Sequence, residues 1–107
     1  MTMQYDNDLE SPHRELFLSV RDILLGIAGT EETKKEKITT YSHNGAGLCQ
    51  MRTMAHGIDI GFLKGFKMED KYGLLHGETK RMRVLSLEAL LSEELEYYLK
   101  EAIDKNS

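Results

Sequence analysis

Hydrophobic positions along the chain follow two different periods, which together predict an α+β fold. Ser11-Pro12 is a helix-start signal, because serine caps a helix and proline is tolerated at its first position. The apolar positions that follow are spaced three or four residues apart, as on one face of a helix that ends at Gly29. They are Leu16, Phe17, Val20, Ile23, Leu24 and Ile27. Residues 1–10 are polar and acidic, so we expect a flexible N-terminal arm before a single domain over residues 11–107.

The middle of the chain changes to the alternation that is typical of strands. Residues 31–37 are charged and have no apolar period, which indicates a connector. Short segments rich in β-branched and aromatic residues follow, separated by the turns Asn44-Gly45 and His56-Gly57. We expect strands at residues 37–42, 48–54, 58–63 and, after a glycine-rich loop over 64–79, at 80–85. Tight turns between successive strands predict an antiparallel sheet.

The last segment returns to helical spacing. Ser92 is a suitable cap, and Glu93 and Glu94 suit the first turn of a helix. The apolar stripe comprises Leu95, Tyr98, Leu99, Ala102 and Ile103. Two amphipathic helices must both bury their stripes, and the sheet is the only partner large enough. We therefore expect a four- to five-stranded antiparallel sheet with the N- and C-terminal helices packed on one face, the other face being open.

Composition narrows the class of protein. A chain of 107 residues with 40% hydrophobic residues is long enough for one core without covalent staples. The single cysteine, Cys49, excludes an internal disulfide and a thiolate-built zinc site. No apolar run approaches the roughly 20 residues that cross a bilayer, and the N-terminus does not resemble a secretion signal. We therefore expect a cytoplasmic protein that does not bind membranes.

The distribution of charge is more informative than the net charge of −4. Residues 64–85 are rich in bases and lie between two acidic segments. This basic island is short and is not interleaved with exposed aromatic residues, which argues against nucleic acid as a partner. Leu18 and Leu25 lie off the helical stripe, so they are either ordinary exposed leucines or one edge of a homodimer contact.

Two motifs in the second half of the chain carry a family resemblance. They are Gly61-Phe62-Leu63-Lys64-Gly65 and Lys80-Arg81-Met82-Arg83, and matching elements extend from Gly47 to Ile103. With them the chain resembles the YdhG-like family, small bacterial domains of unknown function. The family's fold looks like that of frataxin, so the resemblance implies a terminal helix pair on one face of an antiparallel sheet. The glycine- and proline-containing segment of the family is replaced here by Tyr41-Ser42-His43-Asn44.

The sequence contains no recognisable catalytic motif. Cys49 lies in an apolar strand without a nearby His–Asp partnership, and no serine lies in a Gly-x-Ser-x-Gly elbow. The four histidines are scattered and form no pair with metal-ligand spacing. We therefore predict no catalytic residue, metal ligand or cofactor. One family member has been described as an iron chaperone, so the resemblance leaves open an iron-binding protein that uses acidic residues of the first helix.

The basic strand expected at residues 80–85 is the part of the sequence that says most about a binding site. If Met82 and Val84 face the helices, Arg81 and Arg83 face the open side, because successive side chains of a strand alternate. Depending on register, the open face also holds either Gln50 and Arg52 or Cys49 and Met51.

These residues lead to one hypothesis of function. We expect an anion-binding site formed by Asp59, Gly61, Lys64, Arg81 and Arg83, since guanidinium groups suit anions and glycine lets a ligand approach the sheet. The alternative is that the charges only support the sheet as cross-strand pairs. The hypothesis predicts a non-enzymatic module that binds a small anionic ligand or a protein partner with the open face and the 64–79 loop.

Overall fold

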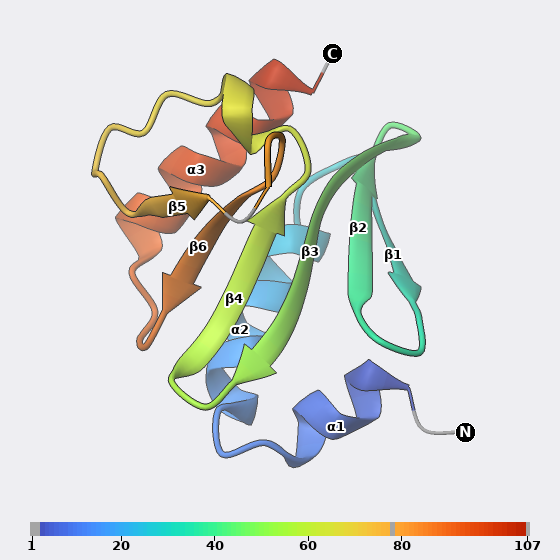
Figure 1. Cartoon of the computed structure of the whole chain (residues 1–107). Helices are drawn as coiled ribbons and strands as arrows, with labels where there is room; N and C mark the ends of the chain where they lie inside the picture. The colour runs from blue at the N-terminus through green and yellow to red at the C-terminus, as the bar shows by residue number, and fades with distance from the viewer. Residues whose placement is uncertain (1–2, 78, 107) are drawn as a thin grey trace.

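The computed structural model describes residues 3–77 and 79–106, which form three α-helices, one 3-10 turn and six β-strands (Figure 1). The helices are α1 (Gln4–Glu10), α2 (Arg14–Leu25) and α3 (Ser92–Lys105), and the 3-10 turn η1 is Gly65–Lys67. The strands are β1 (Thr30–Lys34), β2 (Thr39–His43), β3 (Ala46–Met54), β4 (Gly57–Phe62), β5 (Leu75–Gly77) and β6 (Arg83–Leu87). They form one antiparallel sheet in the order β1-β2-β3-β4-β6-β5. The α+β class is confirmed, but the described residues form six strands where four to five were expected.

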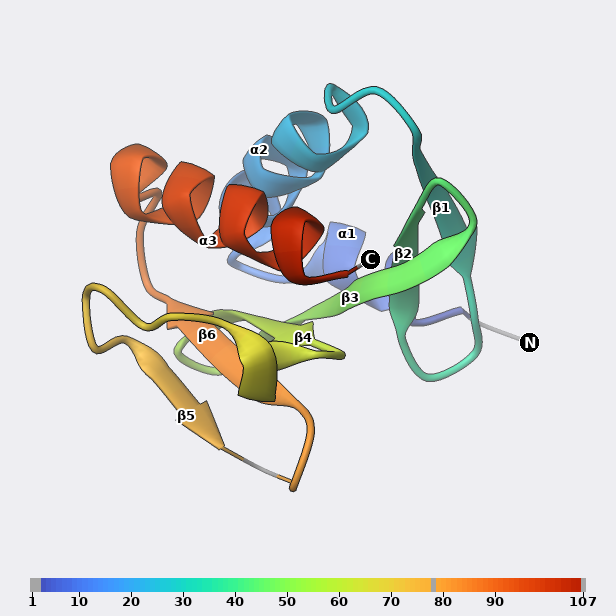
Figure 2. The ribbon, with the colours of Figure 1, turned by 90° about the horizontal axis from the view of Figure 1, so that it is seen from above.

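Helices α2 and α3 lie over the same face of the sheet, as their apolar stripes require (Figure 2). The core between the two layers is fully or almost fully buried. Its helical members are Phe17, Val20, Leu24, Leu95, Tyr98, Leu99 and Ala102. Its sheet members are Tyr41, Leu48, Cys49, Met51, Ile58, Ile60, Phe62, Leu85 and Leu87. We call the opposite side of the sheet the open face. Among the described residues, no helix has the length and apolar character needed to traverse a bilayer.

The N-terminal segment differs from the flexible arm expected for residues 1–10, because residues 4–10 form helix α1. Asp8 is fully buried and accepts hydrogen bonds from the backbone nitrogen and the Oγ1 of Thr53 on β3, at 3.0 and 2.7 Å. The Tyr5 ring packs against Phe17 of α2, with 5.7 Å between centroids. An acidic side chain therefore attaches this segment to the sheet. Met1 and Thr2 lie outside the described residues.

Both edges of the sheet come from segments that were expected to be a connector and a loop. All residues of β1 except Thr30 lie within the expected connector at residues 31–37, and β1 pairs with β2, for example Thr33 with Thr40. Charged side chains are typical of edge strands, because they discourage pairing with another chain. β5 has three residues, lies within the 64–79 loop and pairs with β6. Glu78, in the same loop, lies outside the described residues.

Strand β6 begins three residues later than the strand expected at 80–85, and its faces are reversed. Leu85 and Leu87 are buried under the helices, while Val84 lies opposite Gly61 on the open face. The prediction that Met82 and Val84 face the helices is therefore wrong. The reason is that the leucine pair fills the core better, and a shift of one residue moves every side chain of a strand to the other face.

Candidate functional site

A groove of about 430 Å³ runs across the open face of the sheet. Its volume lies in the range of about 300–1,000 Å³ that is usual for small-ligand pockets. It is lined by Ile38, Gln50, Arg52, Met54, Asp59, Gly61, Met82 and Val84. The lining combines four apolar side chains with a few polar groups, which is the composition of a site that binds and orients a small molecule.

The register of β3 decides which of its residues line this groove. Gln50 and Arg52 pair with Gly61 and Asp59 of β4 and line the groove, whereas Cys49 and Met51 are fully buried on the covered face. The alternative that the sequence left open is thus resolved in favour of Gln50 and Arg52.

Gly61 provides the room in which Met82 lies across the strand. A Cβ atom at Gly61 would lie 2.8 Å from Met82 Sδ, which is closer than real Cβ contacts allow. The Nε2 of Gln50 donates a long hydrogen bond of 3.7 Å to the same sulfur. Since a thioether is flexible and a weak acceptor, this contact is easily exchanged for a ligand.

A chain of hydrogen bonds runs beside the groove from β4 to β5. Asp59 Oδ1 accepts a 2.6 Å hydrogen bond from Ser86 Oγ and lies 2.7 Å from His56 Nε2. His76 Nε2 lies 2.8 Å from Ser86 Oγ. The single hydroxyl proton of Ser86 points to a carboxylate, so Ser86 is not arranged as a nucleophile activated by a histidine that an aspartate orients.

Arg52 is the unpaired cation of the groove. It lies directly across from Asp59 in the β3–β4 register, where opposite charges can stabilise a sheet by pairing. Oδ1 of that carboxylate is engaged by His56 and Ser86. Within residues 3–77 and 79–106, the exposed Arg52 side chain makes no hydrogen bond or ion pair with another side chain or the backbone.

Of the five predicted site residues, the structure brings only Asp59 and Gly61 together in the groove. Lys64 Nζ donates a 3.0 Å hydrogen bond to the carbonyl oxygen of Asn106, at the end of α3. Arg81 is exposed in the segment before β6 and does not line the groove. The prediction for these two residues therefore does not match their placement.

The prediction that Arg83 faces the open side is wrong. Arg83 begins β6 on the covered side, where its Cβ fits closely against Gly65 of η1. Its Nη1 donates to the carbonyl oxygens of Thr79 and Met82, both at 2.9 Å. The guanidinium therefore fastens the segment before β6 and does not face a ligand.

Residues 69–74 of the 64–79 loop pack on α3, and no described residue of the loop lines the groove. Tyr97 Oη donates to the carbonyl oxygen of Glu69 at 2.6 Å, and Tyr98 Oη donates to Asp70 Oδ1 at 2.5 Å. Burial and the bond to Asp70 raise the pKa of Tyr98 to about 12. These contacts hold residues 69–74 of the loop against α3.

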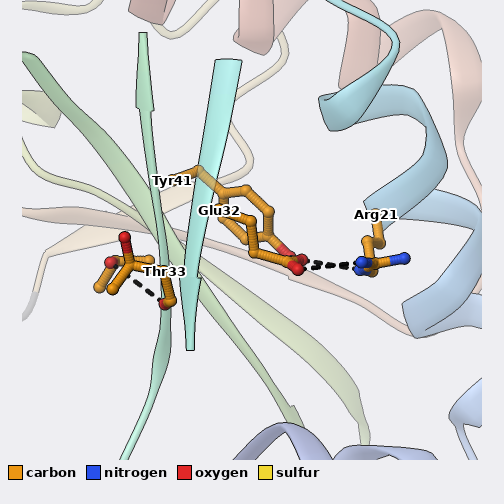
Figure 3. Close-up of polar contacts among 5 residues, drawn as sticks. Arg21, Glu32, Thr33 and Tyr41 are labelled. Atoms are coloured by element: carbon orange, nitrogen blue, oxygen red, sulfur yellow. Dashed lines mark hydrogen bonds and ion pairs between the residues drawn. The ribbon is translucent and has the colours of Figure 1, made fainter. Parts of the chain in front are cut away.

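A second polar network joins the helix layer to the edge of the sheet (Figure 3). Glu32 of β1 accepts hydrogen bonds from Nε and Nη2 of Arg21 at 2.7 and 2.9 Å, and from Tyr41 Oη at 2.9 Å. Burial raises the pKa of Glu32, but the hydrogen bonds from Arg21 and Tyr41 outweigh it and hold the pKa below its ordinary value. The side chains of Arg21, Glu32 and Tyr41 satisfy one another's hydrogen-bonding groups, so we assign the network a structural role.

Metal-binding donors do not converge in the part of the chain that is described. Within residues 3–77 and 79–106 no group of three or more histidines, cysteines, aspartates or glutamates lies close enough together to hold an ion. Asp8 and Glu32, acids of the N-terminal third, are used to attach α1 and α2 to the sheet. The iron-binding alternative thus stays a prediction.

The residues that were missed as ligand candidates include Arg52 and Met82 in the groove, and His56 and Ser86 beside it. Arg52 was only a register-dependent alternative, and Met82 was placed in the core. The Leu85-Ser86-Leu87 alternation was the signal in the sequence for the correct face of β6, because one polar residue between two leucines indicates an outward side chain.

Comparison of the chain with models of protein families, with curated proteins and with solved structures gives no match. The resemblance to the YdhG-like family therefore stays a prediction.

Proposed function

We propose that the protein is a binding module that holds a small organic anion in the groove on the open face. Arg52 supplies the positive charge, and Met54, Met82 and Val84 supply the apolar contact surface. The proposal keeps the anionic ligand and the cytoplasmic location expected from the sequence. It replaces Arg81 and Arg83 with Arg52 and leaves out the 64–79 loop.

The unpaired guanidinium of Arg52 is the observation that carries this proposal. An arginine opposite an aspartate in a sheet can form a stabilising ion pair, but no ion pair joins Arg52 to Asp59 within residues 3–77 and 79–106, and Asp59 Oδ1 is engaged by His56 and Ser86. A guanidinium presents five N–H donors in a planar fork that matches a carboxylate or a phosphate. The groove therefore has a charged donor group ready for an anion.

We also propose the YdhG-like relationship and the frataxin-like fold as the wider context of this module. The motifs around Gly61–Gly65 and Lys80–Arg83 support the first. Helices α2 and α3 on one face of an antiparallel sheet support the second (Figure 2).

Calorimetric titration with 3-phenylpropanoate tests the proposed function. This probe carries one carboxylate and an aromatic ring, which suits a groove with two methionines because sulfur atoms make favourable contacts with rings. We expect saturable binding to the wild-type chain. Arg52→Gln removes a charge-assisted hydrogen bond and should weaken binding about tenfold or more.

Arg81→Gln is the matched control, since Arg81 is an exposed arginine outside the groove. It should bind the probe as tightly as the wild type. Absence of binding, or equal affinities of the wild type and Arg52→Gln, contradicts the proposal. Loss of binding in Arg81→Gln alone would instead support the site predicted from the sequence.

A further inference from the structure

Asp59 is the second charged group of the groove, and one of its oxygens is uncommitted. Oδ1 receives both the Ser86 hydroxyl and the His56 ring, while Oδ2 makes no hydrogen bond within the described part of the chain. The side chain is 23% exposed, so solvent and a ligand can reach it. The two bonds to Oδ1 fix the orientation of the carboxylate, and a fixed carboxylate with a free oxygen is a strong acceptor for an ammonium group.

Arg52 and Asp59 thus place a positively charged hydrogen-bond donor and a negatively charged hydrogen-bond acceptor side by side. They are register partners on β3 and β4, and both line the groove. Directly opposed residues of an antiparallel pair have Cβ atoms about 4.5–5.5 Å apart. A ligand that satisfies both groups needs a carboxylate and an ammonium close together in one molecule.

From this arrangement, and resting on the proposed function, we infer that the ligand is a zwitterion, an α-amino acid with a large apolar side chain. The carboxylate binds Arg52, the ammonium binds Asp59 Oδ2, and the side chain lies on the apolar part of the groove. That part consists of Ile38, Met54, Met82 and Val84.

The volume and chemistry of the groove favour a free amino acid of this kind. About 430 Å³ is at the small end of ligand pockets and suits one amino acid. Methionine side chains adapt their shape to aliphatic and aromatic groups alike. Since the hydrogen bond to the Met82 sulfur is the weak 3.7 Å contact from Gln50, the Met82 side chain can move to accommodate the ligand side chain.

A zwitterionic probe and two fragments, each of which lacks one of its charged groups, test the inference on the wild-type full chain. They are L-phenylalanine, 3-phenylpropanoate, which lacks the ammonium group, and 2-phenylethylamine, which lacks the carboxylate. Calorimetric titration should give an affinity for L-phenylalanine that is about tenfold or more above that of either fragment, because each fragment loses one charge-assisted contact.

The variant Asp59→Asn gives a second readout, because it should change the affinities for L-phenylalanine and for 3-phenylpropanoate in opposite directions. L-Phenylalanine should bind about tenfold more weakly, since the ammonium loses its partner. 3-Phenylpropanoate should bind more tightly, since the carboxylate that repels it is gone. Damage to the fold would weaken both probes together, so the crossing of the two effects is specific to charge recognition.

The failure of this inference differs from the failure of the proposed function. If L-phenylalanine binds no more tightly than 3-phenylpropanoate, and the latter still depends on Arg52, the zwitterion is wrong and the anion-binding function stands. If 2-phenylethylamine binds as tightly as L-phenylalanine, the inference is also overturned. The proposed function falls only when 3-phenylpropanoate does not bind or binds independently of Arg52.

Discussion

Replacing Glu32 with glutamine should destabilise the protein strongly, because Glu32 is the common acceptor of the network that joins α2 to β1 and β2. Its side chain is 9% exposed, and that of its partner Arg21 is 23% exposed. Glutamine keeps the shape but turns one acceptor oxygen into a donor that faces the donors of Arg21 or Tyr41.

The size of the effect follows from the burial of the pair. Breaking a fully buried ion pair by removing one partner costs about 3–5 kcal/mol, and a hydrogen bond to a charged group is worth about 1.5–3 kcal/mol. Since Arg21 keeps some contact with water, we expect the free energy of unfolding to fall by about 2–3 kcal/mol. For a chain of this length that corresponds to a decrease in Tm of roughly 10 °C.

Urea unfolding of the wild type and of Glu32→Gln measures this difference directly. Glu31→Gln is the matched control: Glu31 is the preceding residue of β1, is exposed, and has no hydrogen-bond or ion-pair partner within residues 3–77 and 79–106. The control should change the free energy of unfolding by less than about 0.5 kcal/mol. Equal effects of the two substitutions on the free energy of unfolding would show that Glu32 is not the acceptor that holds α2 to β1.

The same network predicts a dependence on pH. The pKa of Glu32 is held below its ordinary value of 4.5, so the ionised carboxylate stabilises the fold above that pH. This contribution is lost as the pH falls through the lowered pKa of the folded state. The stability difference between the wild type and Glu32→Gln should therefore be largest near neutral pH and shrink below about pH 4.5. A difference that is constant down to pH 3 would contradict the assignment.

Four further predictions test other parts of the fold. Cys49 is fully buried and burial raises its pKa to about 12, so its thiol should not react with Ellman's reagent at pH 8 until urea unfolds the chain. Gly57→Ala should cost more than about 2 kcal/mol, because the φ angle is +153° and the new Cβ would meet a backbone oxygen at 2.0 Å. Gly61→Ala, which meets only flexible side chains, should change stability by less than about 1 kcal/mol while weakening ligand binding. Tyr98→Phe should cost about 1–2 kcal/mol and speed hydrogen exchange in the 64–79 loop, since the bond to Asp70 is lost; unchanged exchange would contradict its role.

The central elements were predictable because their side chains must be buried. The helical stripes and the apolar faces of β3 and β4 follow from the core. The antiparallel order follows from the tight turns at residues 44–45 and 55–56, the second one residue before the turn expected at His56-Gly57. The edge strands were not predictable in this way. β1 is charged and β5 is three residues long, so their pairing comes from neighbouring strands and leaves no apolar period in their own sequence.

The site was predictable only in part because it depends on register. Asp59 and Gly61 were found since β4 has one unambiguous apolar face. Arg52 and Met82 depend on how β3 and β6 align with β4, which the sequence of each strand alone does not determine. The contacts of His56 and Ser86 with Asp59, and the absence of an ion pair between Asp59 and Arg52 among the described residues, depend on three-dimensional geometry.

The most direct test of the binding site is a map of amide chemical shifts for the isotope-labelled chain titrated with 3-phenylpropanoate. We expect the largest changes to cluster at residues 50–54, 59–61 and 82–84, which surround the groove. Changes centred on α3 and the 64–79 loop, or no changes at saturating probe, would contradict the proposed binding site.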